Sequence, residues 1–278
     1  MVVSRETLAG LRVALPRLKS DDAIAAALKT AGAQVDTFAL TQTIPIESEQ
    51  LEQMRQRLAS GYYAWVVLSS WRAAQAVLAQ LNALALAPAS APTPHPPTSA
   101  PTRLAAVGQS TADWVNTHCA LKPTLVGAGS AAKLLEVFPT PPPATTAAAS
   151  TVATPTICLP QSQLAAPTLA QGLSQLGWQV DAVATYTTVP LPQLPAHLKT
   201  QWQAGAWDAV VVTAGSSAQA LLQLLGPPPE KTAVVSIGQS TTARCRELGL
   251  RVDATAARPR AEHITQAIIN LFKAKDFS

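Results

Sequence analysis

Hydrophobic and polar positions alternate in short blocks along most of this 278-residue chain. The blocks predict strands at residues 11–15, 34–40, 64–68, 103–107 and 124–126, and helices at 21–31, 72–81, 111–117 and 130–138. The run 64–68 is entirely apolar, which is typical of a parallel strand covered by helices on both faces of its sheet. Strands that alternate with helices predict an α/β fold built from right-handed βαβ units.

The same pattern occurs twice in the chain. The repeated segments are Ala14-Leu15-Pro16 with Cys158-Leu159-Pro160, Gln34-Val35-Asp36 with Gln179-Val180-Asp181, Val66-Val67-Leu68-Ser69 with Val210-Val211-Val212-Thr213, Ala74-Gln75-Ala76 with Ala218-Gln219-Ala220, and Gly108-Gln109-Ser110-Thr111 with Gly238-Gln239-Ser240-Thr241. Their spacing is nearly constant, except that the last pair is closer together. A proline-rich stretch between the fourth and fifth segments of the first copy accounts for this difference. The order of these matches predicts two copies of one α/β unit, with a loop inserted in the first.

Two segments interrupt the pattern, at residues 86–101 and 139–155, and both are rich in Pro, Ala and Thr. Such segments cannot bury enough apolar area to offset their chain entropy, and proline stiffens them toward polyproline II. They are predicted to be surface loops or linkers without a chemical role.

The numbers of basic and acidic residues argue against one class of function, nucleic-acid binding. Lys and Arg number 20 against 16 Asp and Glu, charged residues are 13%, and the basic residues form no run. This surplus is too small for a nucleic-acid binder that depends on electrostatics, but it suits a small acidic ligand.

The cysteines and the hydropathy indicate the compartment. Three separate cysteines, with no Cys/His cluster, argue against zinc and against a disulfide framework, and they favour a reducing compartment. The first ten residues lack the apolar core of a signal peptide, and no segment outside the proline-rich stretches resembles a membrane span. We therefore expect a cytoplasmic protein.

Hydroxyl side chains follow the predicted strands at four corners where a helix begins. The corners contain Ser69 and Ser70; Ser110 and Thr111; Thr213 with Ser216 and Ser217; and Ser240 and Thr241. The carboxyl ends of parallel strands meet at one edge of a sheet, and helix N-termini there offer unpaired N–H groups to an anion. Each corner alone is explained better by ordinary N-capping. All four together favour an anion-binding site.

Standard catalytic motifs are missing from the sequence. There is no GxGxxG, Walker, HExxH or GxSxG motif, and the four histidines are scattered. Asp36 and Asp181 occupy equivalent positions, which duplication explains better than a carboxylate dyad does. Tyr186 stands out because it follows the second Gln-Val-Asp segment, where a strand end leads into a crossover, and a phenol can donate a proton to a leaving oxygen. Packing of an amphipathic side chain at a domain edge explains Tyr186 equally well.

Taken in order, seven segments resemble the uroporphyrinogen-III synthase family. They are residues 14–17 (ALPR), 66–70 (VVLSS), 106–111 (AVGQST), 157–160 (ICLP), 179–190 (QVDAVATYTTVP), 210–217 (VVVTAGSS) and 237–243 (IGQSTTA). No single segment is diagnostic, but their order and spacing are specific, and they cover nearly the whole chain outside the proline-rich stretches.

The resemblance implies two flavodoxin-like parallel-sheet domains with a cleft between them. On this basis residues 1–40 and 189–278 form a discontinuous domain, residues 46–183 form a domain inserted into it, and residues 41–45 and 184–188 form a two-stranded connector. The duplication by itself predicts two consecutive halves instead, and this division remains the alternative.

The resemblance also implies an activity, a lyase reaction of heme and chlorophyll biosynthesis. Hydroxymethylbilane, a linear tetrapyrrole with eight carboxylates, is cyclised to uroporphyrinogen III with loss of water and inversion of ring D. The pyrroles supply the electrons, so no metal or organic cofactor is expected. The family further implies a monomer, and transient contact with the preceding pathway enzyme remains open.

Family residues transfer to matching positions of this chain. Tyr186 matches the tyrosine proposed to assist hydroxyl departure, and the matching substrate-binding positions are Ser69, Ser70, Thr111, Thr213, Ser216, Ser240 and Thr241. Two positions depart from the family pattern, since Gln161 replaces a frequent Arg, and Trp71-Arg72 replace a usual Pro-Asn. Arg72 and Arg17 are candidates for binding substrate carboxylates, although Arg72 is explained equally well as a solvated helix residue.

Two other function classes fit parts of the pattern. A two-lobed binding protein for a small anionic ligand, without catalysis, would also use duplicated lobes and hydroxyl corners. Such proteins usually act outside the membrane, and the sequence shows no export signal. A nucleotide-sugar transferase would need a stronger phosphate-binding loop or an acidic pair.

Overall fold

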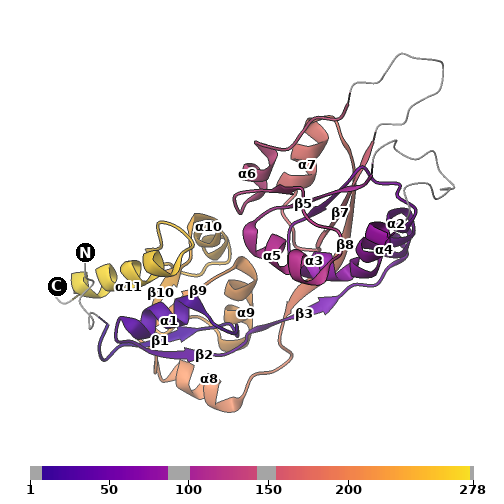
Figure 1. Ribbon diagram of the computed structural model, residues 1–278. Coiled ribbons are helices and arrows are strands. Elements are labelled where there is room, and N and C mark those ends of the chain that lie inside the picture. Colours follow the sequence, from indigo (N-terminus) through magenta and orange to yellow (C-terminus); the bar gives the residue numbers. More distant parts are fainter. Residues whose placement is uncertain (1–7, 87–100, 143–154, 276–278) are drawn as a thin grey trace, which may run out of the picture. The chain divides into compact units, whose positions relative to one another are not determined.

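The computed structural model describes residues 8–86, 101–142 and 155–275, and the chain forms two compact units (Figure 1). Unit 1 consists of Met1–Thr43 and Thr188–Ser278, and unit 2 of Ile44–Thr187. A continuous segment is therefore inserted into a discontinuous unit, and the chain is not divided into consecutive halves. The proline-rich stretches 86–101 and 139–155 fall mostly outside the described residues.

Unit 1 contains a five-stranded parallel sheet with the strand order β11-β10-β9-β1-β2. Its strands are β1 (Arg12–Leu15), β2 (Gln34–Thr37), β9 (Ala209–Val212), β10 (Ala233–Ser236) and β11 (Ala254–Thr255). Counted within the unit this order is 2-1-3-4-5, which is the flavodoxin-like order. The strand order reverses between β1 and β9, and ligands of such sheets bind outside the carboxyl ends of the strands at this point.

Helices cover both faces of this sheet. The helices are α1 (Ala23–Thr30), α8 (Ala196–Gln203), α9 (Gly215–Leu225), α10 (Gln239–Glu247) and α11 (Ala261–Lys275). Alternate residues of β1 point to opposite faces, so Val13 and Leu15 pack with α1 and α11, while Ala14 packs with the cluster of α8, α9 and α10. Figure 1 shows α1 and α8 on opposite sides of β1 and β2.

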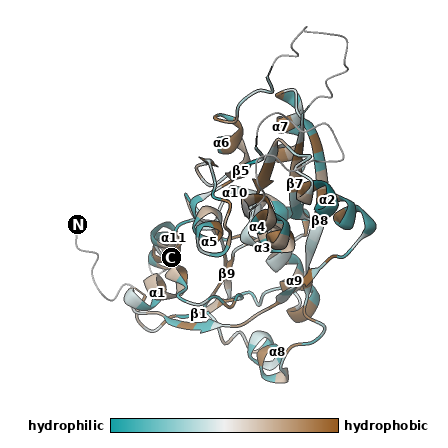
Figure 2. Cartoon of the chain, turned by 45° about the vertical axis from the view of Figure 1, so that its right-hand side comes forward, coloured by the Kyte–Doolittle hydropathy of each residue, from teal (hydrophilic) through white to brown (hydrophobic). Residues whose placement is uncertain are grey.

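Unit 2 contains a six-stranded sheet with the order β3-β8-β7-β4-β5-β6. Its strands are β3 (Thr41–Pro45), β4 (Trp65–Leu68), β5 (Arg103–Ala106), β6 (Leu125–Val126), β7 (Thr156–Ser162) and β8 (Gln179–Pro190). Its helices are α2 (Glu49–Ala59), α3 (Trp71–Ala76), α4 (Leu78–Leu86), α5 (Gln109–His118), α6 (Ala131–Leu135) and α7 (Thr168–Gln175). Every residue of β4 is buried, as expected of a central strand covered on both faces. In Figure 2 the central strands β7 and β9 are brown, because apolar residues dominate them.

The two sheets repeat one order, which confirms the α/β fold with two parallel-sheet units. In unit 2, β7 and β8 take the places that β1 and β2 take in unit 1, and β4, β5 and β6 take those of β9, β10 and β11. Gly32 and Gly177, each with a φ of +97°, end the equivalent helices α1 and α7. Each repeated half of the sequence therefore gives its first two strands to one unit and its last three to the other.

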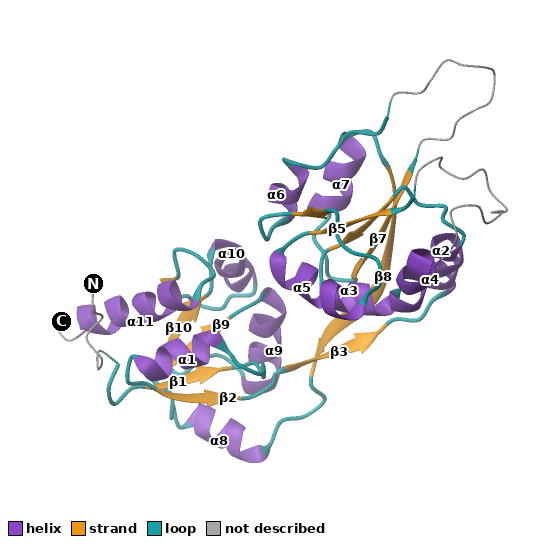
Figure 3. Ribbon diagram, viewed as in Figure 1, coloured by secondary structure: helices purple, strands orange, loops and turns teal. Residues whose placement is uncertain are grey.

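Strands β3 and β8 pass between the units (Figure 3). They run in opposite directions, because Leu191 N–H donates to Leu40 O at one end and Ile46 N–H to Thr185 O at the other. Strand β8 continues to Pro190 without interruption. The prediction that Tyr186 follows a strand end is therefore wrong, since Tyr186 lies inside a long strand.

One helical prediction for unit 2 also needs correction, and one helix of this unit was missed. The single helix predicted at 72–81 is two helices, because Val77 leaves the helical conformation with a φ of −123° and ends α3. Helix α2 was not predicted, although Ser48 caps it and Leu51, Met54 and Leu58 are buried at helical spacing. In the described part of the chain, no helix is long and apolar enough to cross a membrane.

Candidate active site

One hydroxyl corner, at the carboxyl end of β4, makes hydrogen bonds to two other parts of unit 2. Strand β4 pairs with both β7 and β5, and its contact with β7 is the point where the strand order of unit 2 reverses. Ser69 and Ser70 follow β4, and both are half-buried. Ser70 is the N-cap of α3, and its Oγ accepts a hydrogen bond from Ala73 N–H at 3.2 Å. Ordinary capping therefore accounts for part of the role of Ser70.

Tyr186 meets this corner. Its hydroxyl lies 3.0 Å from Ser70 Oγ, within hydrogen-bond distance. Tyr186 sits opposite Ser162 of β7, just after a register shift between Gln161 and Ser162. Such a bulge re-aims the side chains that follow it. The half-buried phenol of Tyr186 and the Ser70 hydroxyl form a pair at the strand-order reversal of unit 2.

At the second corner of unit 2, after β5, only one of the two expected hydroxyl side chains is exposed. Thr111 is 5% exposed in the first turn of α5, whereas Ser110 beside it is exposed. Gly108 is the N-cap residue of α5, and it has no side chain with which to cap the helix. Gly108 approaches the loop after β6 so closely that a Cβ at this position would lie 2.9 Å from Gly129 Cα. The structure thus encloses the Thr111 hydroxyl and leaves Ser110 at the surface.

The corner after β9 is the counterpart of the Ser69–Ser70 corner in unit 1. Thr213 follows β9 where the strand order reverses, and Ser216 lies in the first turn of α9. Both side chains are half-buried, and no side chain caps this helix. Capping therefore does not explain these hydroxyls, and the first N–H groups of α9 have no side-chain acceptor.

At the corner after β10, Ser240 is exposed and Thr241 is 6% exposed. A buried hydroxyl chain that the sequence did not reveal lies below it. Thr242 joins Ser236 and Thr255, with 2.7 Å between the Thr242 and Thr255 hydroxyl oxygens. This chain attaches the start of α10 to β10 and β11. Helix α10 has no side-chain cap either, so capping explains Ser240 no better than it explains Thr213.

The two candidate arginines differ in their partners. Arg17 makes a two-pronged ion pair with Asp22, at 2.5 Å and 2.6 Å, and Asp22 caps α1. Arg72 is exposed and has no ion pair with any described residue; its guanidinium carbon lies 4.4 Å from the centre of the Trp71 ring. Arg17 is thus already paired with a carboxylate, whereas Arg72 is not.

Comparison with known proteins identifies the family. The sequence profile described as uroporphyrinogen-III synthase HemD matches residues 22–266, most of the chain. This chain belongs to the uroporphyrinogen-III synthase family. The family is one of cyclising lyases of tetrapyrrole synthesis, and this assignment does not favour the alternative of a binding protein without catalysis.

Two solved uroporphyrinogen III synthases resemble the chain in fold. A mutant of the Thermus thermophilus protein has a TM-score of 0.58 at 18% identity, over 95% of this chain and 100% of that chain. The Helicobacter pylori protein has a TM-score of 0.58 at 14% identity, over 94% of this chain and 99% of that chain. No curated protein matches the sequence. Identities this low show that the fold is shared, whereas the roles of individual residues need separate evidence.

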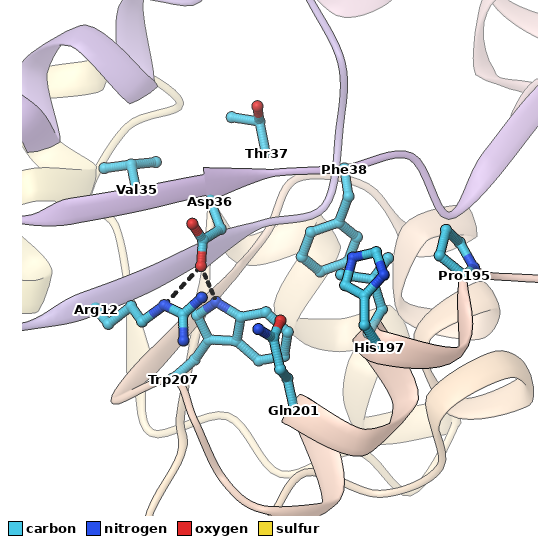
Figure 4. Close-up of a pocket in the computed structure, with 10 residues that line it drawn as sticks. Arg12, Val35, Asp36, Thr37, Phe38, Pro195, His197, Gln201 and Trp207 are labelled. Carbon is cyan, nitrogen blue, oxygen red and sulfur yellow. Dashed lines mark hydrogen bonds and ion pairs between the residues drawn. The ribbon is translucent and has the colours of Figure 1, made fainter.

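In this member of the uroporphyrinogen-III synthase family, one cavity of unit 1 lies away from the hydroxyl corners. It has a volume of about 400 Å³ and is lined by Arg12, Val35, Asp36, Thr37, Phe38, Pro195, His197, Leu198, Gln201 and Trp207 (Figure 4). Asp36 accepts hydrogen bonds from Arg12 Nε and Trp207 Nε1, both at 2.7 Å. Arg12 begins β1 and Trp207 precedes β9, so the cluster lies toward the amino ends of these strands.

Unit 2 has an equivalent cluster around Asp181, the repeat partner of Asp36. Asp181 accepts hydrogen bonds from Tyr63 and from Arg57, the latter at 3.2 Å. Burial, followed by the hydrogen bond to Asp181, raises the pKa of Tyr63 well above its usual value. Tyr63 precedes β4, so this cluster also lies at an amino end. Because both clusters consist of groups that satisfy one another, we assign them to the stability of the sheets.

The described residues hold no group of three or more His, Cys, Asp or Glu side chains that could bind a metal ion. Cys119, Cys158 and Cys245 are buried, free thiols. Burial raises the pKa of each of them, most strongly that of Cys158, and therefore disfavours the reactive thiolate.

Proposed function

We propose that this protein cyclises hydroxymethylbilane to uroporphyrinogen III and that Tyr186 assists the departure of the substrate hydroxyl. The observation that supports this role is the 3.0 Å contact between the Tyr186 hydroxyl and Ser70 Oγ. It places a potential proton donor at the carboxyl edge of the unit 2 sheet, where α/β folds bind their ligands.

The chemistry needs little more than a proton and an orientation. The phenol of Tyr186 gives a proton to the hydroxymethyl oxygen, which leaves as water, while the adjoining pyrrole supplies the electron pair and becomes a protonated azafulvene. The terminal ring attacks through its substituted carbon to give a spiro intermediate. This intermediate fragments and recloses through the unsubstituted carbon of that ring, which loses its proton and so returns one proton for the one that Tyr186 gave. Ser70, fixed as the cap of α3, orients the phenol. If the protein holds the two ends of the linear tetrapyrrole close together, the entropic part of the barrier to ring closure is lowered.

The polycarboxylate substrate suits the carboxyl edges of both sheets. Helices α5, α9 and α10 begin without side-chain caps, so their first N–H groups are open to acceptors. The hydroxyls assigned to carboxylate binding at or near these edges are those of Ser69, Thr213, Ser216 and Ser240. Thr111 and Thr241 are buried, and they would support these corners from inside.

We further propose that the protein acts in the cytoplasm as a monomer and without a resident cofactor. The three buried free thiols suit a reducing compartment, and the pyrroles themselves provide the electrons that drive the elimination. The small net positive charge of the chain suits a tetrapyrrole with several carboxylates better than it suits a nucleic acid.

One assay tests the proposed function. Purified protein is given hydroxymethylbilane, and the uroporphyrinogen isomers are separated after oxidation. Because type I forms without an enzyme, enrichment in type III is the expected result, and an isomer mixture identical to the enzyme-free reaction would refute the proposal. The assay is repeated with a chelator, and loss of activity would contradict the cofactor-free scheme.

A further inference from the structure

Four planar side chains form a row on the surface of unit 2. The Arg72 guanidinium carbon lies 4.4 Å from the centre of the Trp71 ring. The Trp71 ring lies 6.0 Å from Trp114, and His118 stacks on Trp114 at 4.3 Å with planes 9° apart. Arg72 and Trp71 belong to α3, and Trp114 and His118 belong to α5, which lies beside α3 (Figure 1).

Trp114 packs against the apolar core of unit 2, but core packing does not explain the exposed Trp71 and Arg72 at the other end of the row. Four of the six tryptophans are at most 5% exposed, namely Trp65, Trp178, Trp202 and Trp207. Trp71 is 37% exposed, and Arg72 and His118 are exposed as well. An indole left in water next to an exposed guanidinium is a combination that proteins use to bind ligands.

Arg72 also differs from most arginines of the described chain. Arg12, Arg17, Arg55, Arg57, Arg244 and Arg251 each pair with a carboxylate, whereas Arg72 has no such pair among the described residues. The neighbouring helix α5 carries one acidic residue, Asp113. Its carboxylate accepts a hydrogen bond from the Gln109 side chain. The Arg72 guanidinium is therefore positioned by an aromatic ring, and its N–H groups remain available for an acceptor.

The row adjoins the proposed catalytic pair. Trp71 and Arg72 directly follow Ser70, whose Oγ contacts the Tyr186 hydroxyl at 3.0 Å. The Trp71–Arg72 pair therefore begins the same helix whose cap residue, Ser70, contacts Tyr186. Planar rings with carboxylate side chains match both halves of the pair, because the indole offers an aromatic surface and the guanidinium offers a two-pronged donor.

We propose that Arg72, held by Trp71, binds one carboxylate of the tetrapyrrole substrate, and that Trp71 contacts the pyrrole ring that bears this carboxylate. This inference rests on the proposed function and adds a substrate-positioning element to it. It depends on the contact between the Arg72 guanidinium and the Trp71 ring of this chain.

The test compares Arg72→Gln with Arg103→Gln. Arg103 is the matched control, because it is exposed, lies 5.6 Å from the ring of Trp65, and has no ion pair among the described residues, but stands at the amino end of β5. We expect Arg72→Gln to raise the KM for hydroxymethylbilane about tenfold with kcat changed less, as for a lost charge-assisted contact. Arg103→Gln is expected to leave both constants unchanged.

Further variants separate the two halves of the pair. Trp71→Ala is expected to raise KM, and adding it to Arg72→Gln should raise KM by less than the product of the single effects, because the two side chains act together. Circular dichroism of each variant checks the fold. Equal KM values for the parent protein and a folded Arg72→Gln variant would overturn the inference while leaving the proposed function intact. A parent protein without type III synthesis would instead overturn the proposed function, and the inference with it.

Discussion

At the residue scale, Ser70 combines two tasks in one hydroxyl. Its oxygen accepts the N–H of Ala73 to begin α3, and it contacts the phenol of Tyr186. The sequence predicted the hydroxyl corner and selected Tyr186, but it did not predict that the two would meet. They are 116 positions apart, and their contact depends on the order of β4, β7 and β8 and on the bulge at Thr185 of β8.

Replacing Tyr186 by Phe tests the proposed proton donor. Tyr186→Phe keeps the ring and the fold but removes the acidic hydroxyl, so turnover is expected to fall by about tenfold or more, the lower range for general acid catalysis. The measurement is kcat for type III formation. Tyr62→Phe is the control, because Tyr62 lies near the amino end of β4, and it should leave kcat unchanged. Parent-like turnover of Tyr186→Phe would remove this residue as the acid.

Asp36 provides a second test, of stability. Asp36→Ala leaves Nε1 of Trp207, a residue only 1% exposed, without its acceptor. This should lower the free energy of unfolding by about 1–3 kcal/mol, while kcat per folded molecule stays the same. Urea unfolding measures the first effect, and the isomer assay measures the second.

Glu247→Ala is the comparison for Asp36→Ala. It breaks an exposed ion pair with Arg244 in the same unit and should lower the free energy of unfolding by about 1 kcal/mol at most. A specific loss of activity in Asp36→Ala, at unchanged stability, would mean that the cavity at Asp36 is functional rather than structural.

At the level of single elements, the charge of Asp22 stabilises the start of α1. Burial alone would raise the pKa of Asp22, but hydrogen bonds from Arg17 and from the backbone N–H groups of Ile24 and Ala25 outweigh it. The pKa of Asp22 therefore lies below its usual value. Its ionised form stabilises the fold above the pKa of the unfolded chain, about 3.9, and this contribution disappears as the pH falls through the folded pKa.

Asp22→Asn isolates this effect. Asn still caps the helix but cannot pair with Arg17, so at pH 7 the variant should be less stable by about 1 kcal/mol. The difference between parent and variant should shrink as the pH falls below about 4, where the parent loses its own ion pair. Urea unfolding at pH 7 and at lower pH measures it. A constant difference at every pH would contradict the assigned role of the Asp22 charge.

Several elements could not be predicted in detail from the sequence. The apolar stretch 72–81 reads as one helix, but the turn at Val77 divides it, and only packing against the sheet reveals this break. Helix α2 could have been predicted from its serine cap and from the apolar residues that follow at helical spacing. The many polar residues of this segment made that pattern hard to recognise. The strand extension through Tyr186 follows from its pairing with β3 and β7, which are remote in sequence.

At the scale of the whole molecule, unit 2 is a continuous segment with its own apolar clusters on both faces of its sheet. A fragment of residues 41–190, which includes both connecting strands, is therefore expected to fold alone. Cooperative urea unfolding, followed by tryptophan fluorescence and circular dichroism, measures this. Residues 1–43 joined to 188–278 by a flexible linker form the matched second fragment. An unfolded 41–190 fragment would mean that unit 2 depends on unit 1 for its stability.

The α/β class, the duplication and the hydroxyl-bearing corners could all be predicted from the sequence. These features rest on local periodicity and on residues adjacent in the chain, such as the serines directly after β4. Which unit each strand joins, which hydroxyls are exposed, and the contact of Tyr186 with Ser70 became visible only in the folded chain. Strand pairing and burial are set by the packing of segments far apart in the chain, and no local pattern records which partner each segment takes.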